Sequence, residues 1–289
     1  MAEPVPVKGI DERSLRHPLE MPYFVASVVV NFALLGGAIV LLYLQPDWLK
    51  SYPYIAKQLA LVRDLTLAAL VGLPAISFLR SARRARMVAN AVLASDEQFK
   101  PLRAILEEQC RALGMAAVPE LFITDRVTPP FSQAGSDWNH DYIVLGEAAL
   151  ETDLAQSHDI AEYFIGYELG RIRLGHTQLW NELLLKYIEV IPYLGNPLRH
   201  ARTYSRDRYG AVLSGGRVNA LLLYAANRRL LADLDADDYI RHALGVRGFW
   251  VTLAALQDSM PPLAFRLQEL HKRSMTLQGG IEPRPKETD

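Results

Sequence analysis

The feature that most constrains this chain is a stretch of 22 residues, from 23 to 44, without a single charged side chain. Its sequence is YFVASVVVNFALLGGAIVLLYL, and as an α-helix it would be about 33 Å long. That length matches the hydrocarbon core of a bilayer. A signal peptide would have a shorter apolar region and a small-residue cleavage site, and neither is evident. We therefore predict a transmembrane helix at 23–44; the alternative is a buried core helix.

A second span is predicted over residues 59–79, although only residues 65–79 are uncharged. Arg63 and Asp64 lie about one turn from the helix end, where long side chains reach the membrane interface. The alternative is a charged pathway through the membrane, as in a transporter or channel subunit. Four cations follow the span directly: Arg80, Arg83, Arg84 and Arg86. The positive-inside rule then places residues 1–22 and the main domain in the cytoplasm.

The overall composition excludes two other classes of protein. Lys and Arg total 31 against 32 for Asp and Glu, a net charge of −1, so no general basic field favours a nucleic-acid partner. The single cysteine, Cys110, excludes an intramolecular disulfide framework and any Cys-rich zinc or iron–sulfur site. We therefore expect an integral membrane protein with the lipid bilayer as one partner and no nucleic acid as another.

The remaining sequence predicts a linker helix at 81–100, a main domain at 101–275 and a flexible tail at 276–289. Two runs rich in β-forming residues, 120–124 and 142–145, predict strands, and the sequence TPPFSQAGSDWNHD between them predicts a loop. Apolar periodicity predicts helices at 85–114 (with a new first turn at Pro101), 158–176, 179–191, 200–213, 216–232, 237–256 and 262–273. The helix at 179–191 either packs in the core or rests on the membrane surface.

Three blocks, in order, resemble the motifs of a known family of enzymes. They are YELGRIRLGH at 167–176, IPYLGNPLRHARTYSRDRYGA at 191–211 and SMPPLAFRLQEL at 259–270. They are similar to H-E-L-G-H-I with a following Gly-His, E-Y-x-x-D-R-x-G-A and S/T-H-P-P-L-x-x-R-I in the membrane zinc metallopeptidases of family forty-eight, the HtpX-type and prenyl-protein endopeptidases. The resemblance covers residues 95–273 and implies a helix-rich α+β, zincin-like domain with a small sheet, here preceded by a two-helix transmembrane hairpin.

The resemblance implies a zinc site, but this chain departs from the family at every ligand position. The two histidine positions are Tyr167 and Arg171, and the position of the glutamate ligand is Thr203. The general-base position is retained as Glu168, and the acid that supports a ligand histidine is retained as Asp207. A guanidinium has no lone pair to donate, and a hydroxyl or a neutral phenol is a poor zinc ligand. We therefore predict no metal or other cofactor; zinc is the alternative.

Two further expectations concern what stands at these positions instead. Arg171 follows Glu168 by three residues, so we predict that Tyr167, Glu168, Arg171 and Asp207 form a cluster in which Arg171 lies between the two acids. A chance surface ion pair is the alternative. Of the nearby histidines, His158 lies nine residues before Tyr167, and His176 lies far round the helix from the face of Tyr167 and Arg171. His200, three residues before Thr203, is the only nearby spare imidazole, and we interpret it as a surface residue at the start of a helix.

These observations predict a catalytically inactive pseudopeptidase that binds a peptide or a membrane-protein partner as a regulator, scaffold or holdase. The family binds extended peptide at a strand edge, and the corresponding residues here are Tyr142, Ile143, Val144, Leu145 and Gly146. The alternative function is an active zinc-dependent membrane endopeptidase in membrane protein quality control. The motif set favours a bacterial inner membrane.

Overall fold

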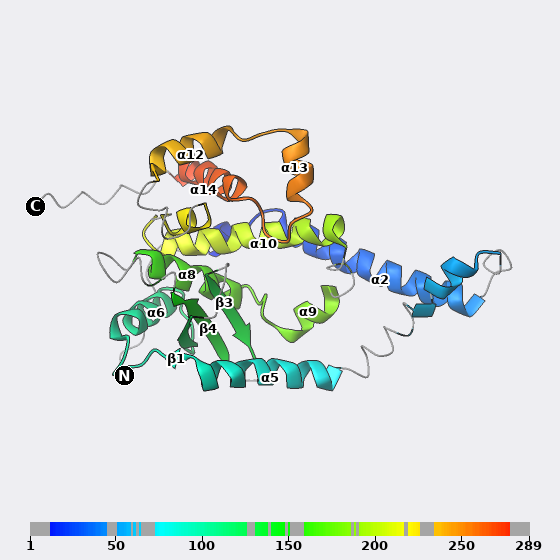
Figure 1. The fold of residues 1–289 in the computed structure, drawn as a ribbon, viewed down its shortest axis with the longest axis horizontal. Coiled ribbons are helices and arrows are strands. Elements are labelled where there is room, and N and C mark those ends of the chain that lie inside the picture. Colours follow the sequence, from blue (N-terminus) through cyan, green and yellow to red (C-terminus); the bar gives the residue numbers. More distant parts are fainter. Residues whose placement is uncertain are drawn as a thin grey trace, which may run out of the picture.

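The protein is described by a computed structural model that covers residues 12–44, 51–58, 60–61, 64, 73–125, 131–137, 140–147, 150, 159–185, 188, 191–216, 219–225 and 234–277. Within these residues the fold is α+β, with many helices around one small sheet, as predicted. Figure 1 shows the long helix α10 (Pro192–Leu213) crossing the middle, the sheet on one side of it, and the last helices on the other.

The first predicted span forms a helix, α2 (Glu20–Leu44), which follows the short α1 (Glu12–Leu15). It is the one helix within the described residues that is long and apolar enough to cross a membrane, and only 17% of its window Glu20–Gly37 is buried. Most of the second predicted span lies outside the described residues, which do not include 65–72. Its last residues open α5 (Leu73–Asn90), which continues as one helix through the four arginines.

The sheet has four strands in the order β1-β2-β4-β3. Strand β2 (Glu120–Thr124) pairs in parallel with β4 (Asp141–Gly146), and both outer pairings are antiparallel. Strand β1 (Val92–Leu93) interrupts the helix predicted at 85–114 and the linker helix predicted at 81–100. The linker is therefore part of the sheet, and the next helix, α6 (Lys100–Ala112), begins after it.

The structure corrects two predictions at the other side of the sheet. Strand β3 (Ser132–Ser136) forms where we predicted a loop, and it pairs with β4 in the register Ala134 to Ile143. Consequently Tyr142 to Gly146 is an inner strand with a neighbour on each side, not an exposed edge. Gly135 fits here because it has no side chain: a Cβ would lie 2.4 Å from the ring of Tyr142.

The two faces of the sheet are covered by different helices, as the alternation of side chains dictates. Phe122, Tyr142 and Val144 face α5, where Met87 and Ala91 pack against them. The alternate residues belong to the main core, which lies between the sheet and α8 (Asp159–Arg173). The two inner strands, β2 and β4, are thus buried on both faces.

Helices α8 and α10 pack closely together, and glycines allow the approach. A Cβ on Gly170 would lie 2.7 Å from the Cβ of Tyr209, and one on Gly210 would lie 2.9 Å from the carbonyl oxygen of Tyr163. Helix α10 starts eight residues before the predicted 200 and continues through Pro197, although proline cannot donate a helical hydrogen bond.

The remaining elements also differ from the predicted boundaries. The helix predicted at 179–191 is described only as α9 (Leu179–Leu185), and η2 (Asn219–Tyr224) is a 3-10 turn within the predicted 216–232. The helix predicted at 237–256 is two helices, α12 (Ala236–Gly245) and α13 (Phe249–Ala255), separated at Gly248, whose φ of 140° other residues rarely adopt. Helix α14 (Leu263–Leu277) closes the described chain.

Candidate functional site

Helices α8, α10 and α14 bring together most of the residues that the sequence singled out. Tyr167, Glu168, Thr203 and Asp207 are each 1% exposed, and Arg266 from α14, which we had not predicted, is buried to the same extent. Such large and charged side chains enter a core only when they are paired. The contacts that pair them decide what this cluster can do.

Asp207 is held by Arg266. The guanidinium donates from Nε to Oδ2 at 2.9 Å and from Nη2 to Oδ1 at 2.6 Å, and the Tyr163 hydroxyl donates to Oδ1 at 2.9 Å. This geometry is the strong, two-pronged form of an arginine–carboxylate pair. The prediction that Arg171 lies between Glu168 and Asp207 is wrong for Asp207, because Arg266 takes that place.

Tyr167, at the first histidine position, lies between two arginines. The guanidinium carbon of Arg206 is 4.6 Å from the centre of its ring, and that of Arg266 is 5.6 Å away. Burial raises the pKa of Tyr167, so the phenol is neutral at physiological pH. Its hydroxyl has no hydrogen-bond partner among the described residues.

Thr203, at the position of the glutamate ligand, is engaged by its own helix. Its hydroxyl donates to the carbonyl oxygen of Arg199 at 2.9 Å and accepts from Nη2 of Arg206 at 3.0 Å. Arg206 therefore contacts the side chains at two of the three inferred ligand positions, Tyr167 and Thr203. The arginine that contacts these two side chains is Arg206, not the predicted Arg171.

Glu168, at the general-base position, serves as an anchor for the outer strand of the sheet. Oε1 accepts from the Ser132 hydroxyl at 2.9 Å, and Oε2 accepts from the backbone N–H of Ala134 at 2.8 Å. The predicted pairing with Arg171 exists only as a 3.8 Å contact, and the side chain of Arg171 is 30% exposed. Glu168 thus accepts from the N–H of Ala134, which points away from β4. An incoming peptide strand would otherwise bind this N–H.

These donors do not fit the zinc ion that the resemblance implies. The three positions offer a neutral phenol, a guanidinium and a hydroxyl that is already bonded, while two further guanidinium groups flank them. Over the parts of the chain that the structure describes, no group of three His, Cys, Asp or Glu side chains is arranged to hold a metal ion.

The nearby histidines have structural partners. His200 is buried, not at the surface as we predicted, and its Nε2 lies 2.9 Å from the carbonyl oxygen of Asp258. Burial lowers its pKa, which keeps the ring neutral. His176 contacts Glu20 at 2.9 Å through Nε2, and burial lowers its pKa to about 4. His158 lies outside the described residues.

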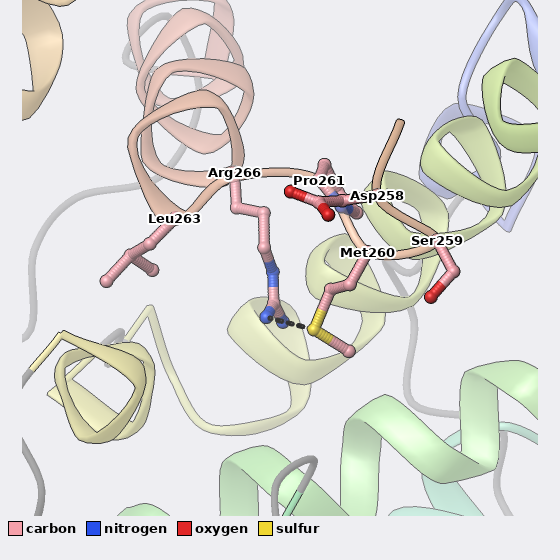
Figure 2. Close-up of a pocket in the computed structure, with 6 residues that line it drawn as sticks. All are labelled: Asp258, Ser259, Met260, Pro261, Leu263 and Arg266. Atoms are coloured by element: carbon pink, nitrogen blue, oxygen red, sulfur yellow. Dashed lines mark hydrogen bonds between the residues drawn. The ribbon is translucent and has the colours of Figure 1, made fainter. Parts of the chain in front are cut away.

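A hollow of about 390 Å³ opens beside the cluster, on the loop before α14. Figure 2 shows its lining residues, Asp258, Ser259, Met260, Pro261, Leu263 and Arg266. Arg266 reaches across it, with Nη1 3.8 Å from Sδ of Met260. The sequence carried a signal for this role: an arginine inside the apolar block SMPPLAFRLQEL requires a buried acid as its partner.

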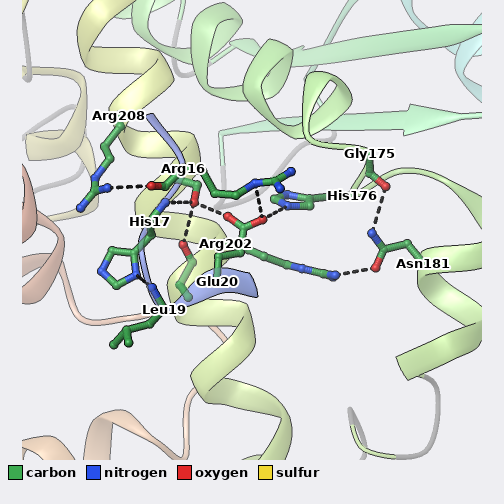
Figure 3. Close-up of polar contacts among 11 residues, drawn as sticks. Arg16, His17, Leu19, Glu20, Gly175, His176, Asn181, Arg202 and Arg208 are labelled. Carbon is green, nitrogen blue, oxygen red and sulfur yellow. Dashed lines mark hydrogen bonds and ion pairs between the residues drawn. The ribbon is translucent and has the colours of Figure 1, made fainter. Parts of the chain in front are cut away.

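A second polar cluster, not predicted, fixes the start of α2 to the domain (Figure 3). The Ser205 hydroxyl and His176 both contact the Glu20 carboxylate, and the backbone N–H of His17 donates to the Ser205 oxygen at 2.8 Å. Arg208 donates to the carbonyl oxygen of Arg16 at 3.2 Å. The apolar helix therefore begins inside the folded domain rather than after a linker.

Neither the models of known protein families nor the curated protein sequences gave a match to this chain. The resemblance to zinc metallopeptidases rests on the three sequence blocks and stays a prediction.

Proposed function

We propose that this protein is a membrane-anchored, metallopeptidase-like protein that has lost zinc-dependent peptide hydrolysis and binds a peptide or membrane-protein partner as a regulator, scaffold or holdase. The observation that carries the proposal is the position of Arg206, which contacts the side chains at two of the three inferred ligand positions. A guanidinium at that place repels a divalent cation and cannot coordinate it.

The use of Glu168 supports the same conclusion. A general base in zinc hydrolysis must accept a proton from the metal-bound water. Here both oxygens of Glu168 accept hydrogen bonds from β3, and the residue is buried. Its role in this fold is to hold Ser132 and Ala134 against α8.

The proposed location is a membrane, crossed by α2 and by the segment that leads into α5, with the domain in the cytoplasm; a bacterial inner membrane is part of the proposal. Two of the four arginines that set this orientation also dock α5 on the domain. Arg80 lies 3.1 Å from Glu182, and Arg84 lies 2.7 Å from Glu120. These pairs join the end of the second predicted span to the domain.

Among the described residues, the hollow beside Arg266 is a place where a partner can bind near the inferred ligand positions. The resemblance implies that a peptide strand binds beside β4, but β4 is an inner strand of the sheet. On the neighbouring β3, the N–H of Ala134 already donates to Glu168, which hinders the addition of a strand there. The hollow beside Arg266 is instead lined by apolar groups from Met260, Pro261 and Leu263, with Asp258 at its rim. It has the size and character to hold one apolar side chain of a partner.

Metal content of the detergent-purified protein tests the proposal. We expect well below one zinc per chain, measured by mass spectrometry without chelator and after zinc supplementation. The matched variant Y167H/R171H/T203E/R206A restores the inferred ligands and removes the cation, and we expect it to take up about one zinc per chain. About one tightly bound zinc in the unaltered protein, lost in E168Q/H200A, would instead support an active endopeptidase, and proteolysis would be assayed next.

A further inference from the structure

We propose that the end of the domain formed by α9 and the first turns of α10 is immersed in the bilayer that α2 crosses, so that lipid covers its exposed apolar side chains. We call this surface the lipid-facing end and define it by Trp180, Ile191, Tyr193 and Leu194. The inference rests on the proposed membrane anchoring through α2 and adds a second, non-spanning contact with the same membrane.

The first argument is the way α2 packs on the domain. Phe24, Val28 and Val30 pack against a small cluster formed by Leu185, Ile188 and Leu198. The side chain of Asn31 accepts a hydrogen bond from the backbone N–H of Ile188 at 3.2 Å and is buried. The first part of the apolar stretch is therefore bound to α9 and to the start of α10.

The second argument is length. Residues 32–44, which extend beyond these contacts, make only about 20 Å of helix, whereas the hydrocarbon core is about 30 Å thick. The span is long enough only if residues 23–31 also lie in hydrocarbon. The groups packed against those residues then lie at the same depth, so α9 and the start of α10 enter the membrane by about 10 Å.

The exposed face of α2 agrees with this placement. Val25 and Val29 lie within the segment bound to the domain, yet both are more than half exposed on the side away from it. In water, such a face would be an unpartnered apolar stripe. In lipid, it is the ordinary surface of a spanning helix.

The third argument is the chemistry of the surface that surrounds α2. Trp180 is 73% exposed, and Ile191, Tyr193 and Leu194 are exposed as well. Tryptophan and tyrosine concentrate where a membrane protein meets the headgroups, because each ring has an apolar body and a polar edge. Figure 1 shows α9 and the first turns of α10 at the end of the domain from which α2 departs.

Helix α13 adds two more aromatic side chains at this end. Phe249 and Trp250 are largely exposed. The helix is joined to the start of α10 by two hydrogen bonds, from Gln257 to the Tyr193 hydroxyl at 2.7 Å and from Asn196 to the carbonyl oxygen of Leu256 at 2.8 Å. We assign these aromatics to the headgroup region around the lipid-facing end.

The charged residues next to the apolar stretch agree with this placement of the membrane boundary. Glu20 is the last acid before the apolar stretch, and its carboxylate is buried against Ser205 and His176 instead of facing lipid. Arg80 pairs with Glu182 on α9, and a long side chain of this kind reaches the interface from a helix end. Glu20 and Arg80, two charged groups near the proposed membrane boundary, are thus paired.

Site-directed spin labelling of the full chain in phospholipid vesicles tests the inference. Single cysteines would be introduced in a C110A background, because Cys110 is the chain's one native thiol. W180C and L194C report on the lipid-facing end, and V40C reports on the spanning part of α2. R241C is the aqueous control, because the Arg241 side chain is 74% exposed and Trp180 as a whole residue is 73% exposed. Collision rates with oxygen and with a nickel chelate measure access from lipid and from water.

We expect the oxygen-to-nickel ratio at W180C and L194C to be several-fold higher than at R241C and close to that at V40C. A high ratio at V40C with an R241C-like ratio at W180C and L194C would overturn the inference and leave the anchoring intact. A low ratio at V40C would overturn the anchoring itself. Weak collisions with both reagents at W180C would mean that protein, such as a second copy of this chain, covers the surface, which also overturns the inference.

Discussion

The pair formed by Arg266 and Asp207 offers the sharpest test of how the buried cluster of α8, α10 and α14 is held together. Both side chains are 1% exposed, and two hydrogen bonds of 2.9 and 2.6 Å join them. The substitution R266M keeps most of the volume but removes the cation. It leaves the Asp207 carboxylate buried, with the Tyr163 hydroxyl as its remaining hydrogen-bond donor. An uncompensated buried charge of this kind costs about 3–5 kcal/mol.

The neighbouring Arg171 is the matched control, because it is the arginine that local sequence spacing favoured. Its contact with Glu168 is 3.8 Å long and its side chain is 30% exposed, so solvent screens the attraction. An ion pair of this type contributes about 0–1 kcal/mol. We therefore expect R171M to change stability by a small fraction of the change in R266M.

Thermal unfolding in detergent, followed by circular dichroism, measures both effects. With about 2–4 °C per kcal/mol for a domain of this size, R266M should lower the Tm by about 6–20 °C and R171M by less than about 4 °C. The double variant D207N/R266M should be more stable than R266M, because no buried charge remains unpaired. A Tm of R266M close to that of the unaltered protein, or equal losses in R266M and R171M, would refute this account. If R266M does not fold, R266K and the double variant still rank the contributions.

Three further predictions follow from the same contacts. The pKa of His176 is lowered to about 4 from an ordinary 6.5, so the unfolded chain binds a proton at this residue before the folded chain does as the pH falls. The free energy of unfolding should therefore decline between about pH 6.5 and 4, by at most about 1.4 kcal/mol per pH unit. H176Q should flatten the curve of Tm against pH. E168Q should lower the Tm by an amount that corresponds to about 1–3 kcal/mol, because an amide cannot accept from both Ser132 and Ala134; an unchanged Tm would contradict its anchoring role. G170A should lower the Tm markedly, whereas alanine at Gly37, where no atom lies within 4 Å, should not destabilise the protein.

Sequence reasoning succeeded for elements whose pattern is local. The apolar run of α2, the β-branched and apolar residues of β2 and β4, and the periodicity of α8 and α14 each identify an element from neighbouring residues. Strand β3 could not be found in this way, because SQAGS has little β propensity. It is extended because β4 pairs with it on one side and Glu168 binds its backbone on the other.

The wrong prediction that Arg171 pairs with Asp207 also arose from reasoning with local spacing only. Spacing along one helix predicts that Arg171 pairs with Glu168 three residues earlier, and this contact exists. No spacing rule predicts that Asp207 pairs with Arg266, which is 59 residues away, or that Arg206 stacks on the ring of Tyr167 from a different helix. These pairings depend on how α8, α10 and α14 cross, and that is decided by packing such as the contact of Gly170 with Tyr209.

Glu168 and Asp207 therefore each have a structural role in this fold. Glu168 fastens β3 to α8, and Asp207 fastens α14 to α10. Either carboxylate would be costly to bury alone, but each has donors that come from another element of the fold. Replacing one of them should loosen a whole element of the fold. Stability and zinc content, measured together on E168Q, thus separate an anchoring residue from a general base more directly than an activity assay alone.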